Sequence, residues 1–255
     1  MEVAGEPPLI LDMGTGLRAL GHHLNVGLVP VGKPLRGNCL LTHLHYDHIL
    51  GTPFFPPMRD PGALLEIYGP TQADDTLQTT MANMVKPPFF PVHMSDFRGE
   101  LRYHDLKGND GFQLGGIAVK VRTIPHIGNT LGFRIEADGA AVAYLPDHQA
   151  PVDRATVSPD VLELCDGADL LLHDAQYTED EFAALPDWGH STPNYAVRVA
   201  RESGAKRLAL YHHDPAHSDD EIDRMLREAR DLAADTGALE VDAATEGSTV
   251  DLGER

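Results

Sequence analysis

The stretch Thr42-His43-Leu44-His45-Tyr46-Asp47-His48 decides the interpretation of this sequence. Three imidazoles and one carboxylate fall directly after a short apolar segment, and together they form a ligand set that suits zinc. In an extended chain His43 and His45 point to one side, so they can share one metal ion. A turn into a helix would displace Asp47 and His48, which can then serve a second ion. A single histidine would be an ordinary surface residue, but four ligand-type residues at this spacing favour a metal site.

Composition limits the classes of protein that this sequence can be. Among 255 residues, Lys and Arg number 20 and Asp and Glu number 39, which gives a net charge of −19. This balance argues against a broad surface for nucleic acid or an anionic membrane. Two cysteines are too few for a disulfide framework, and no apolar run reaches the roughly 18 residues of a membrane span. The first residues lack a signal-peptide pattern, so we expect a cytoplasmic protein with one domain over residues 1–255.

The pattern along the chain is that of a mixed α/β protein. Asp138-Gly139 predicts a hairpin turn between two apolar segments. Helices are predicted after Thr192, with Pro193 first and Gly204 beyond the end, and after Ser218, where Glu221 completes a capping box. The expected strands are short and apolar: 8–11, 38–42, 117–122, 131–136, 140–145 and 168–172.

Two proline-rich aromatic segments, 53–57 and 87–91, are expected to be loops. Ordinary packing on the core is the simpler interpretation of their phenylalanines. The functional alternative is an apolar wall beside a pocket, or an interface.

The motif HLHYDH resembles the HxHxDH signature of the metallo-β-lactamase superfamily. Further segments match the ribonuclease Z-like branch of that family, in the family's order. They are the turn Asp12–Gly16, the segment Pro125–Ile135, Tyr144–Asp147, Gly189–Thr192 and Leu208–His212.

The resemblance implies an αββα sandwich, in which two β-sheets pack face to face with helices outside. It also implies a binuclear centre, most simply with two Zn²⁺ ions, although Mn²⁺ or Fe²⁺ can replace them. Asp147 would bridge the ions, and a water molecule activated between them would be the nucleophile. The implied ligands are His43, His45 and His126 for one ion, and Asp47, His48 and His212 for the other.

Two positions have neighbours that could replace them. Asp147 is followed by His148, and the family's preference for a carboxylate favours Asp147. His212 is followed by His213, and the register of the preceding strand favours His212, which leaves His213 as a possible partner of a ligand.

Asp47 and His190 are the predicted catalytic residues. In the branch, the histidine at the position of His190 lies near the scissile phosphate, so we expect it to stabilise charge there or to protonate the leaving oxygen. Because it precedes a helix, backbone N–H groups beside it could also face an anion. A plain capping-region histidine is the alternative. The histidine at 217 is expected to be a solvated loop residue, and no role is assigned to those at 22, 23, 93 and 104.

The leading hypothesis is a zinc-dependent phosphodiesterase that acts on a small phosphodiester such as a cyclic nucleotide. Alternatives are hydrolysis of β-lactams, lactones or phosphotriesters on the same centre, and a metal-binding protein without activity. Neither cysteine lies in an expected ligand segment, where many β-lactam-cleaving members carry one, and His45 stands where oxygen-reducing members carry glutamate.

Nucleic acid is an unlikely partner by this interpretation, because the sequence lacks the basic, glycine-rich arm of the members that process transfer RNA. A homodimer is expected. Relatives place another strand and hairpin before the segment that begins here near Leu9, so the N-terminus is either truncated or leaves a sheet edge for a partner to cover.

Overall fold

The computed structural model describes residues 1–24, 33–72, 75–234, 237 and 239–253. The chain divides into two compact units, Met1–Lys107 and Gly108–Arg255. Each unit has a β-sheet and a hydrophobic core of its own. The prediction that residues 1–255 form a single domain stays a prediction.

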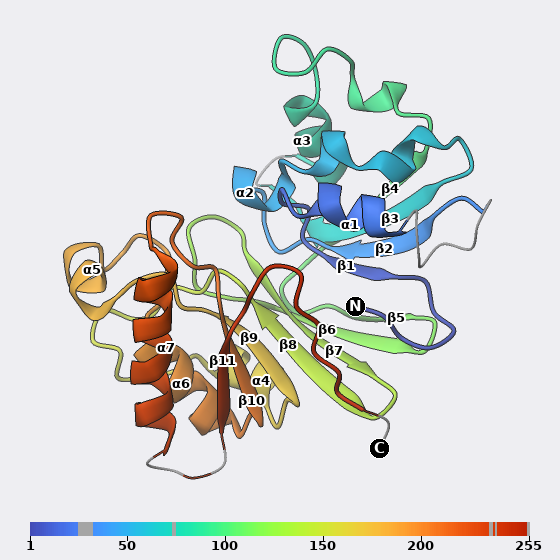
Figure 1. Ribbon diagram of the computed structural model, residues 1–255. Helices are drawn as coiled ribbons and strands as arrows, with labels where there is room; N and C mark the ends of the chain where they lie inside the picture. The colour runs from blue at the N-terminus through green and yellow to red at the C-terminus, as the bar shows by residue number, and fades with distance from the viewer. Residues whose placement is uncertain (25–32, 73–74, 235–236, 238, 254–255) are drawn as a thin grey trace. The chain divides into compact units, whose positions relative to one another are not determined.

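The first unit is built on a four-stranded sheet in which all neighbouring strands are parallel, in the order β1-β2-β3-β4 (Figure 1). Its core combines apolar residues of the sheet with those of helices and 3-10 turns. Its elements are β1 Leu9–Leu11, α1 Leu17–His23, β2 Arg36–Leu40, α2 Tyr46–Ile49, η2 Thr52–Phe54, η3 Pro56–Arg59, β3 Leu64–Pro70, α3 Leu77–Met84, η4 Met94–Asp96 and β4 Glu100–Leu106.

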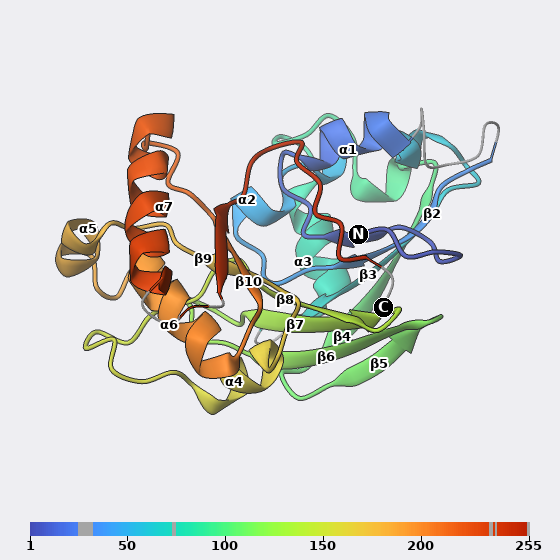
Figure 2. The ribbon, with the colours of Figure 1, turned by 60° about the horizontal axis from the view of Figure 1, so that its bottom comes forward.

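The second unit is built on a seven-stranded mixed sheet in the order β11-β10-β9-β8-β7-β6-β5. Strands β8 to β11 are parallel, whereas β5 to β8 pair antiparallel. Figure 2 shows α6 and α7 beside the β9–β11 part of this sheet. Its elements are β5 Gly111–Leu114, β6 Ile117–Thr123, β7 Leu131–Ala137, β8 Ala140–Leu145, α4 Pro159–Cys165, β9 Leu170–Asp174, α5 Glu179–Ala184, α6 Pro193–Ser203, β10 Arg207–Tyr211, α7 Asp219–Ala234 and β11 Glu240–Ala243.

Several local predictions are confirmed. Asp138 and Gly139 both have positive φ angles, 51° and 78°, and join β7 to β8 in a tight hairpin. Helix α6 begins after Thr192, whose side chain accepts a hydrogen bond from the Tyr195 N–H, and it ends at Gly204 in the left-handed region. Parts of the expected loop 53–57 form the 3-10 turns η2 and η3, because proline is well tolerated at the first position of such a turn.

The strand order of the second unit determines where its polar side chains gather. Strands β8, β9 and β10 are parallel neighbours, and β6 runs in the same direction because two antiparallel pairings separate it from β8. The carboxyl ends of these four strands therefore lie on one edge of the sheet. In parallel sheets this edge is where ligands bind.

Candidate metal centre

The first unit presents its ligand-type residues in the turn after β2 and in α2. His43 is buried, and its Nε2 lies 2.9 Å from Nδ1 of His45, which confirms that these two side chains point to the same place. Helix α2 begins at Tyr46, so the predicted turn into a helix is present. His48 Nε2 lies 3.2 Å from Asp47 Oδ2, with His48 buried and the Asp47 side chain 60% exposed.

Asp12 holds the residues around the predicted ligands of the first unit by hydrogen bonds. Its carboxylate accepts hydrogen bonds from the Thr42 N–H at 2.7 Å and the Thr42 hydroxyl at 2.9 Å, and it lies 2.8 Å from His48 Nδ1. A carboxylate can only accept, so the proton on His48 lies at Nδ1 and its Nε2 offers a lone pair. This arrangement is typical of the partners that orient histidine ligands of metals.

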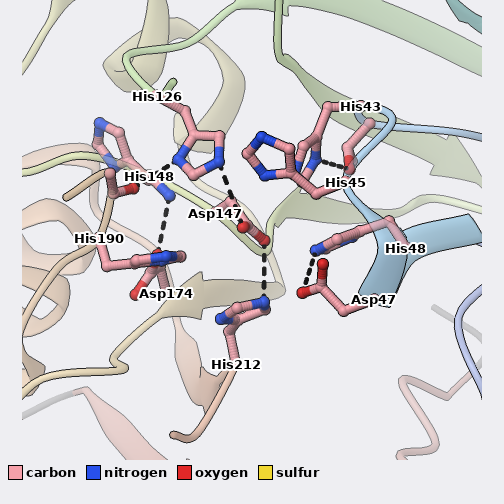
Figure 3. Close-up of polar contacts among 12 residues, drawn as sticks. His43, His45, Asp47, His48, His126, Asp147, His148, Asp174, His190 and His212 are labelled. Carbon is pink, nitrogen blue, oxygen red and sulfur yellow. Dashed lines mark hydrogen bonds and ion pairs between the residues drawn. The ribbon is translucent and has the colours of Figure 1, made fainter. Parts of the chain in front are cut away.

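In the second unit, Asp147 lies between two imidazoles (Figure 3). Its Oδ2 is 3.5 Å from Nε2 of His126, and its Oδ1 is 3.3 Å from Nε2 of His212. The side chains of Asp147 and His126 are almost fully buried, and that of His212 is 18% exposed. Each carboxylate oxygen thus faces a different histidine, as a bridge between two ions requires.

The outer nitrogen of each of these histidines has a protein partner. His126 Nδ1 donates to the backbone carbonyl of Gly189 at 2.6 Å, and His212 Nδ1 lies 2.8 Å from Oε1 of Gln176. With the protons at Nδ1, both Nε2 atoms offer lone pairs on the side of Asp147.

The ligand candidates that the sequence left open lie in different surroundings. His148 is fully buried, and its Nδ1 lies 2.8 Å from Nε2 of His173. Burial lowers the pKa of both imidazoles below their usual range, which keeps this pair neutral. The ring of His213 bonds to the backbone of Ala244, and burial lowers its pKa as well. It is His212 that faces Asp147.

His190 lies among the predicted ligands of the second unit. Its ring centroid is 5.3 Å from that of His126 and 5.1 Å from that of His212, with which it stacks at 14°. Its Nδ1 donates to Oδ2 of Asp174 at 2.8 Å, so Nε2 carries the lone pair in the neutral form. The alternative of a plain capping residue does not explain this arrangement, because Thr192 caps the helix instead.

Asp174 is the main site residue that sequence reasoning missed. Its fully buried carboxylate accepts from the N–H groups of His148, Gln176 and Ser191, and from the His190 ring. Asp174, His190 and His212 also offer ligand atoms within 4.8 Å of one another. Because four donors already saturate this carboxylate, it is suited to orient His190 rather than to bind a metal.

At the start of helix α6 the N–H of Ser191 donates to the Asp174 carboxylate at 3.1 Å, so this group is already occupied by an anion of the protein itself. The prediction for His217 is wrong, since its side chain is only 7% exposed and its Nε2 lies 2.9 Å from Glu181. The acidic first turn of α5 supplies this partner, which the sequence of the loop alone could not reveal.

Comparison with known proteins identifies the class to which this fold and site belong. The family model described as "Beta-lactamase superfamily domain" matches residues 18–213, and the chain belongs to this family. A curated Ribonuclease Z of Myxococcus xanthus is 29% identical over 83% of this chain and 79% of its own length.

Solved structures show the same fold. The metallo-β-lactamase fold protein YhfI of Bacillus subtilis has a TM-score of 0.68 at 20% identity, covering 96% of this chain and 88% of its own. Unliganded yeast PDE1 has a TM-score of 0.68 at 15% identity, covering 96% and 91%. The predicted family and α/β fold class are thereby confirmed, and the chain is a hydrolase of this superfamily.

The expectations for a nucleic-acid partner and for the cellular location are not confirmed. The comparisons give no support to the view that nucleic acid is an unlikely partner, since curated relatives carry the name Ribonuclease Z. Among the helices that the structure describes, none has the length and apolar character needed to cross a membrane. The cytoplasmic location stays a prediction.

Proposed function

We propose that this chain is a binuclear zinc-dependent phosphodiesterase that acts on small phosphodiesters such as cyclic nucleotides. The observation that carries the proposal is the position of Asp147, whose two oxygens face His126 and His212 separately. A carboxylate between two imidazoles whose outer nitrogens are already bonded fits a bridge between two divalent cations.

The donor set of both units fits zinc. In the proposal the histidine and aspartate ligands of the first unit complete the coordination that those of the second unit begin. One ion is held by His43, His45 and His126, the other by Asp47, His48 and His212, with Asp147 shared. Imidazole nitrogen and carboxylate oxygen suit Zn²⁺, and also Mn²⁺ or Fe²⁺. When bound, such a pair of cations activates water near neutral pH and offsets charge on phosphoryl oxygens.

His190 is proposed as the residue that handles the proton of the leaving oxygen. Its Nδ1 is held by Asp174, so Nε2 is the atom that exchanges a proton with substrate. The buried carboxylate stabilises the imidazolium form, in which Nε2 carries the proton that passes to the leaving oxygen and leaves His190 neutral. Asp47, which is exposed at the start of α2, is proposed to combine a ligand role with a role in catalysis.

An RNA substrate is the second candidate function. It is favoured by the Ribonuclease Z relative at 29% identity and opposed by the net charge of −19. β-Lactams, lactones and phosphotriesters are the remaining candidates on the same centre, and a metal-binding protein without turnover is the last.

Metal analysis beside a substrate panel tests the proposal. Wild type and the variants His43→Ala, Asp147→Asn and His190→Ala are assayed with bis(p-nitrophenyl) phosphate, cyclic AMP, a β-lactam, a lactone, a phosphotriester and a precursor transfer RNA. We expect two zinc ions per chain and turnover led by the small phosphodiesters. The first two variants should lose metal, whereas His190→Ala should keep metal and lose turnover.

The matched control is His22→Ala, which removes an exposed histidine outside both groups of ligands and should change neither metal content nor turnover. A wild type that binds two ions and cleaves no phosphodiester would overturn the proposed activity. A panel led by the precursor transfer RNA would replace it with the second candidate.

The organisation of the chain is part of the proposal. The family model spans the boundary between the two units at residues 107 and 108, which supports one catalytic domain over residues 1–255. We also propose a homodimer, which light scattering after size-exclusion chromatography tests. A monomer mass at assay concentrations would remove the dimer.

A further inference from the structure

The one tryptophan of the sequence lies in an unusual place. Trp188 is 60% exposed, although large aromatic side chains are mostly buried in proteins. It belongs to the loop between α5 and α6, two residues before His190. An exposed indole two residues from the proposed proton donor needs a reason.

The backbone on both sides of Trp188 is fixed by one side chain, Gln149. Its amide nitrogen donates to the carbonyl of Pro186 at 2.8 Å, and its Oε1 accepts from the N–H of Gly189 at 2.5 Å. Gln149 comes two residues after Asp147 at the end of β8. The backbone before and after the tryptophan is therefore bonded to a residue that closely follows the predicted bridging ligand in the chain.

Gly189 brings this loop against the segment of the third predicted histidine ligand. Its carbonyl accepts from His126 Nδ1, and its φ angle is +99°. A Cβ added to Gly189 would lie 2.7 Å from Nδ1 of His126 and 3.5 Å from Cγ1 of Ile127, so only glycine allows this close approach. Ile127 is itself 54% exposed.

Ile127 and Trp188, which we call the apolar rim, thus belong to two loops that are in contact at Gly189. Each rim residue is close in sequence to a site residue, His126 or His190, and the rings of those two are 5.3 Å apart (Figure 3). The rim therefore lies on the two loops that carry His126 and His190. The chain has a net charge of −19, so basic side chains are few. An apolar contact of this kind can bind part of a substrate without them.

We propose that the apolar rim is a specificity site, on which Trp188 stacks against the flat aromatic group of the substrate, a nucleobase or an aryl ester group. This inference rests on the proposed phosphodiesterase function and narrows its substrate class. Stacking on an aromatic side chain is strong and tolerates different bases, because every base offers a π-face. Phosphodiesters without an aromatic group gain nothing from the rim.

A competing location lies in the first unit. Phe54 and Phe89 are 51% and 80% exposed, and the Phe54 ring packs edge-on against Phe90 at 5.8 Å. These phenylalanines lie in the proline-rich segments that the sequence offered as an apolar wall. No hydrogen bond that the structure describes ties them to a predicted site residue, which favours Trp188.

The test compares two ligands that carry the same phosphate group. AMP and ribose 5-phosphate differ by the adenine base, and Trp188 is the sole indole whose fluorescence can respond. We expect AMP to change the emission of the zinc-loaded protein saturably and ribose 5-phosphate to leave it nearly unchanged. By calorimetry, Trp188→Ala should weaken AMP binding about tenfold or more, Trp188→Phe should retain most of the affinity, and binding of ribose 5-phosphate should stay the same.

Turnover gives a second measurement. Trp188→Ala should raise KM for cyclic AMP and for bis(p-nitrophenyl) phosphate and leave that for glycerophosphoglycerol unchanged, because this diester carries neither an aromatic ring nor a cation. The control Phe89→Ala should resemble wild type throughout.

Equal affinity of the wild type for AMP and ribose 5-phosphate would overturn the rim and leave the phosphodiesterase intact. So would a loss that appears in Phe89→Ala instead of Trp188→Ala. If neither ligand binds and no phosphodiester is cleaved, the proposed function fails with it.

Discussion

Replacing Asp174 by asparagine tests the arrangement around His190 most directly. The carboxylate is fully buried and accepts four hydrogen bonds. Oδ2 accepts from the N–H of His148 at 3.0 Å and from His190 Nδ1 at 2.8 Å, and Oδ1 accepts from the N–H groups of Gln176 and Ser191 at 3.0 and 3.1 Å. All four partners are donors.

An asparagine of nearly the same shape cannot satisfy them. If its NH₂ group takes the place of Oδ1, it meets two backbone N–H groups, and two of the four hydrogen bonds are lost. If it takes the place of Oδ2, the bond from the His148 N–H is lost, and His190 can accept from the NH₂ group only by moving its proton from Nδ1 to Nε2. Hydrogen bonds to charged groups contribute about 1.5–3 kcal/mol each, so one or two lost bonds give a loss of about 1.5–6 kcal/mol in the free energy of unfolding. This is a large share of the roughly 5–15 kcal/mol that stabilises an ordinary domain.

Urea denaturation and zinc-saturated turnover of bis(p-nitrophenyl) phosphate measure the two consequences. His190→Ala removes one of the four bonds and should destabilise the protein less than Asp174→Asn. Both variants should lower kcat by about 10²–10⁴-fold, because each deprives the reaction of an oriented proton donor. An Asp174→Asn protein with the unfolding midpoint of wild type and a kcat within about twofold would refute the reasoning.

Three further outcomes are expected. Gly189→Ala places a Cβ 2.7 Å from His126 Nδ1 at a φ of +99°, so zinc affinity should fall about tenfold or more, as measured by competition with a chelator. Burial raises the pKa of Cys165 to about 12 and that of Cys39 well above its usual range, so both thiols should react only when their own unit opens. The rate at which each thiol is labelled, measured by mass spectrometry, gives the free energy of opening around that cysteine. Equal values at the two cysteines would support one cooperative domain, and unequal values would contradict it. Burial lowers the pKa of His173, so its contribution to the free energy of unfolding should be fully present above pH about 6.5. Below that pH the free energy of unfolding should fall by up to about 1.4 kcal/mol per pH unit, because the unfolded chain binds the proton more tightly. Urea denaturation at several pH values should show a flatter slope for His173→Gln.

The sequence predicted best where the chemistry is local. The strand before the HxHxDH motif and the two capped helices are specified by residues within a few positions of one another. The hairpin at Asp138-Gly139 is also local, because its positive φ angles suit those two residue types. For the same reason the alternation of side chains along an extended segment was enough to place His43 and His45 together.

The partners of the site residues could not be predicted in this way. Gln149 and Gly189 are 40 residues apart in the chain, and His126 and Gly189 are 63 apart, so their contacts depend on the strand order of the second sheet. Asp174 did leave a signal, since it ends an apolar strand as Asp147 follows one. Gln149 left none, because a glutamine after a strand is typical of any loop.

Two site residues have a strained backbone conformation that costs stability. Non-glycine residues rarely have positive φ, and such strain costs of order 1–3 kcal/mol at one position. Asp12 and His212 have φ angles of 56° and 58°, each directly after a strand, β1 and β10. The first accepts from His48, and the second faces Asp147. The same sharp turn at a strand end thus recurs in both units at or beside a predicted ligand. A regular strand would carry the Asp12 and His212 side chains away from the end of the sheet. The strained turn is best explained by the need to direct each side chain back over that end.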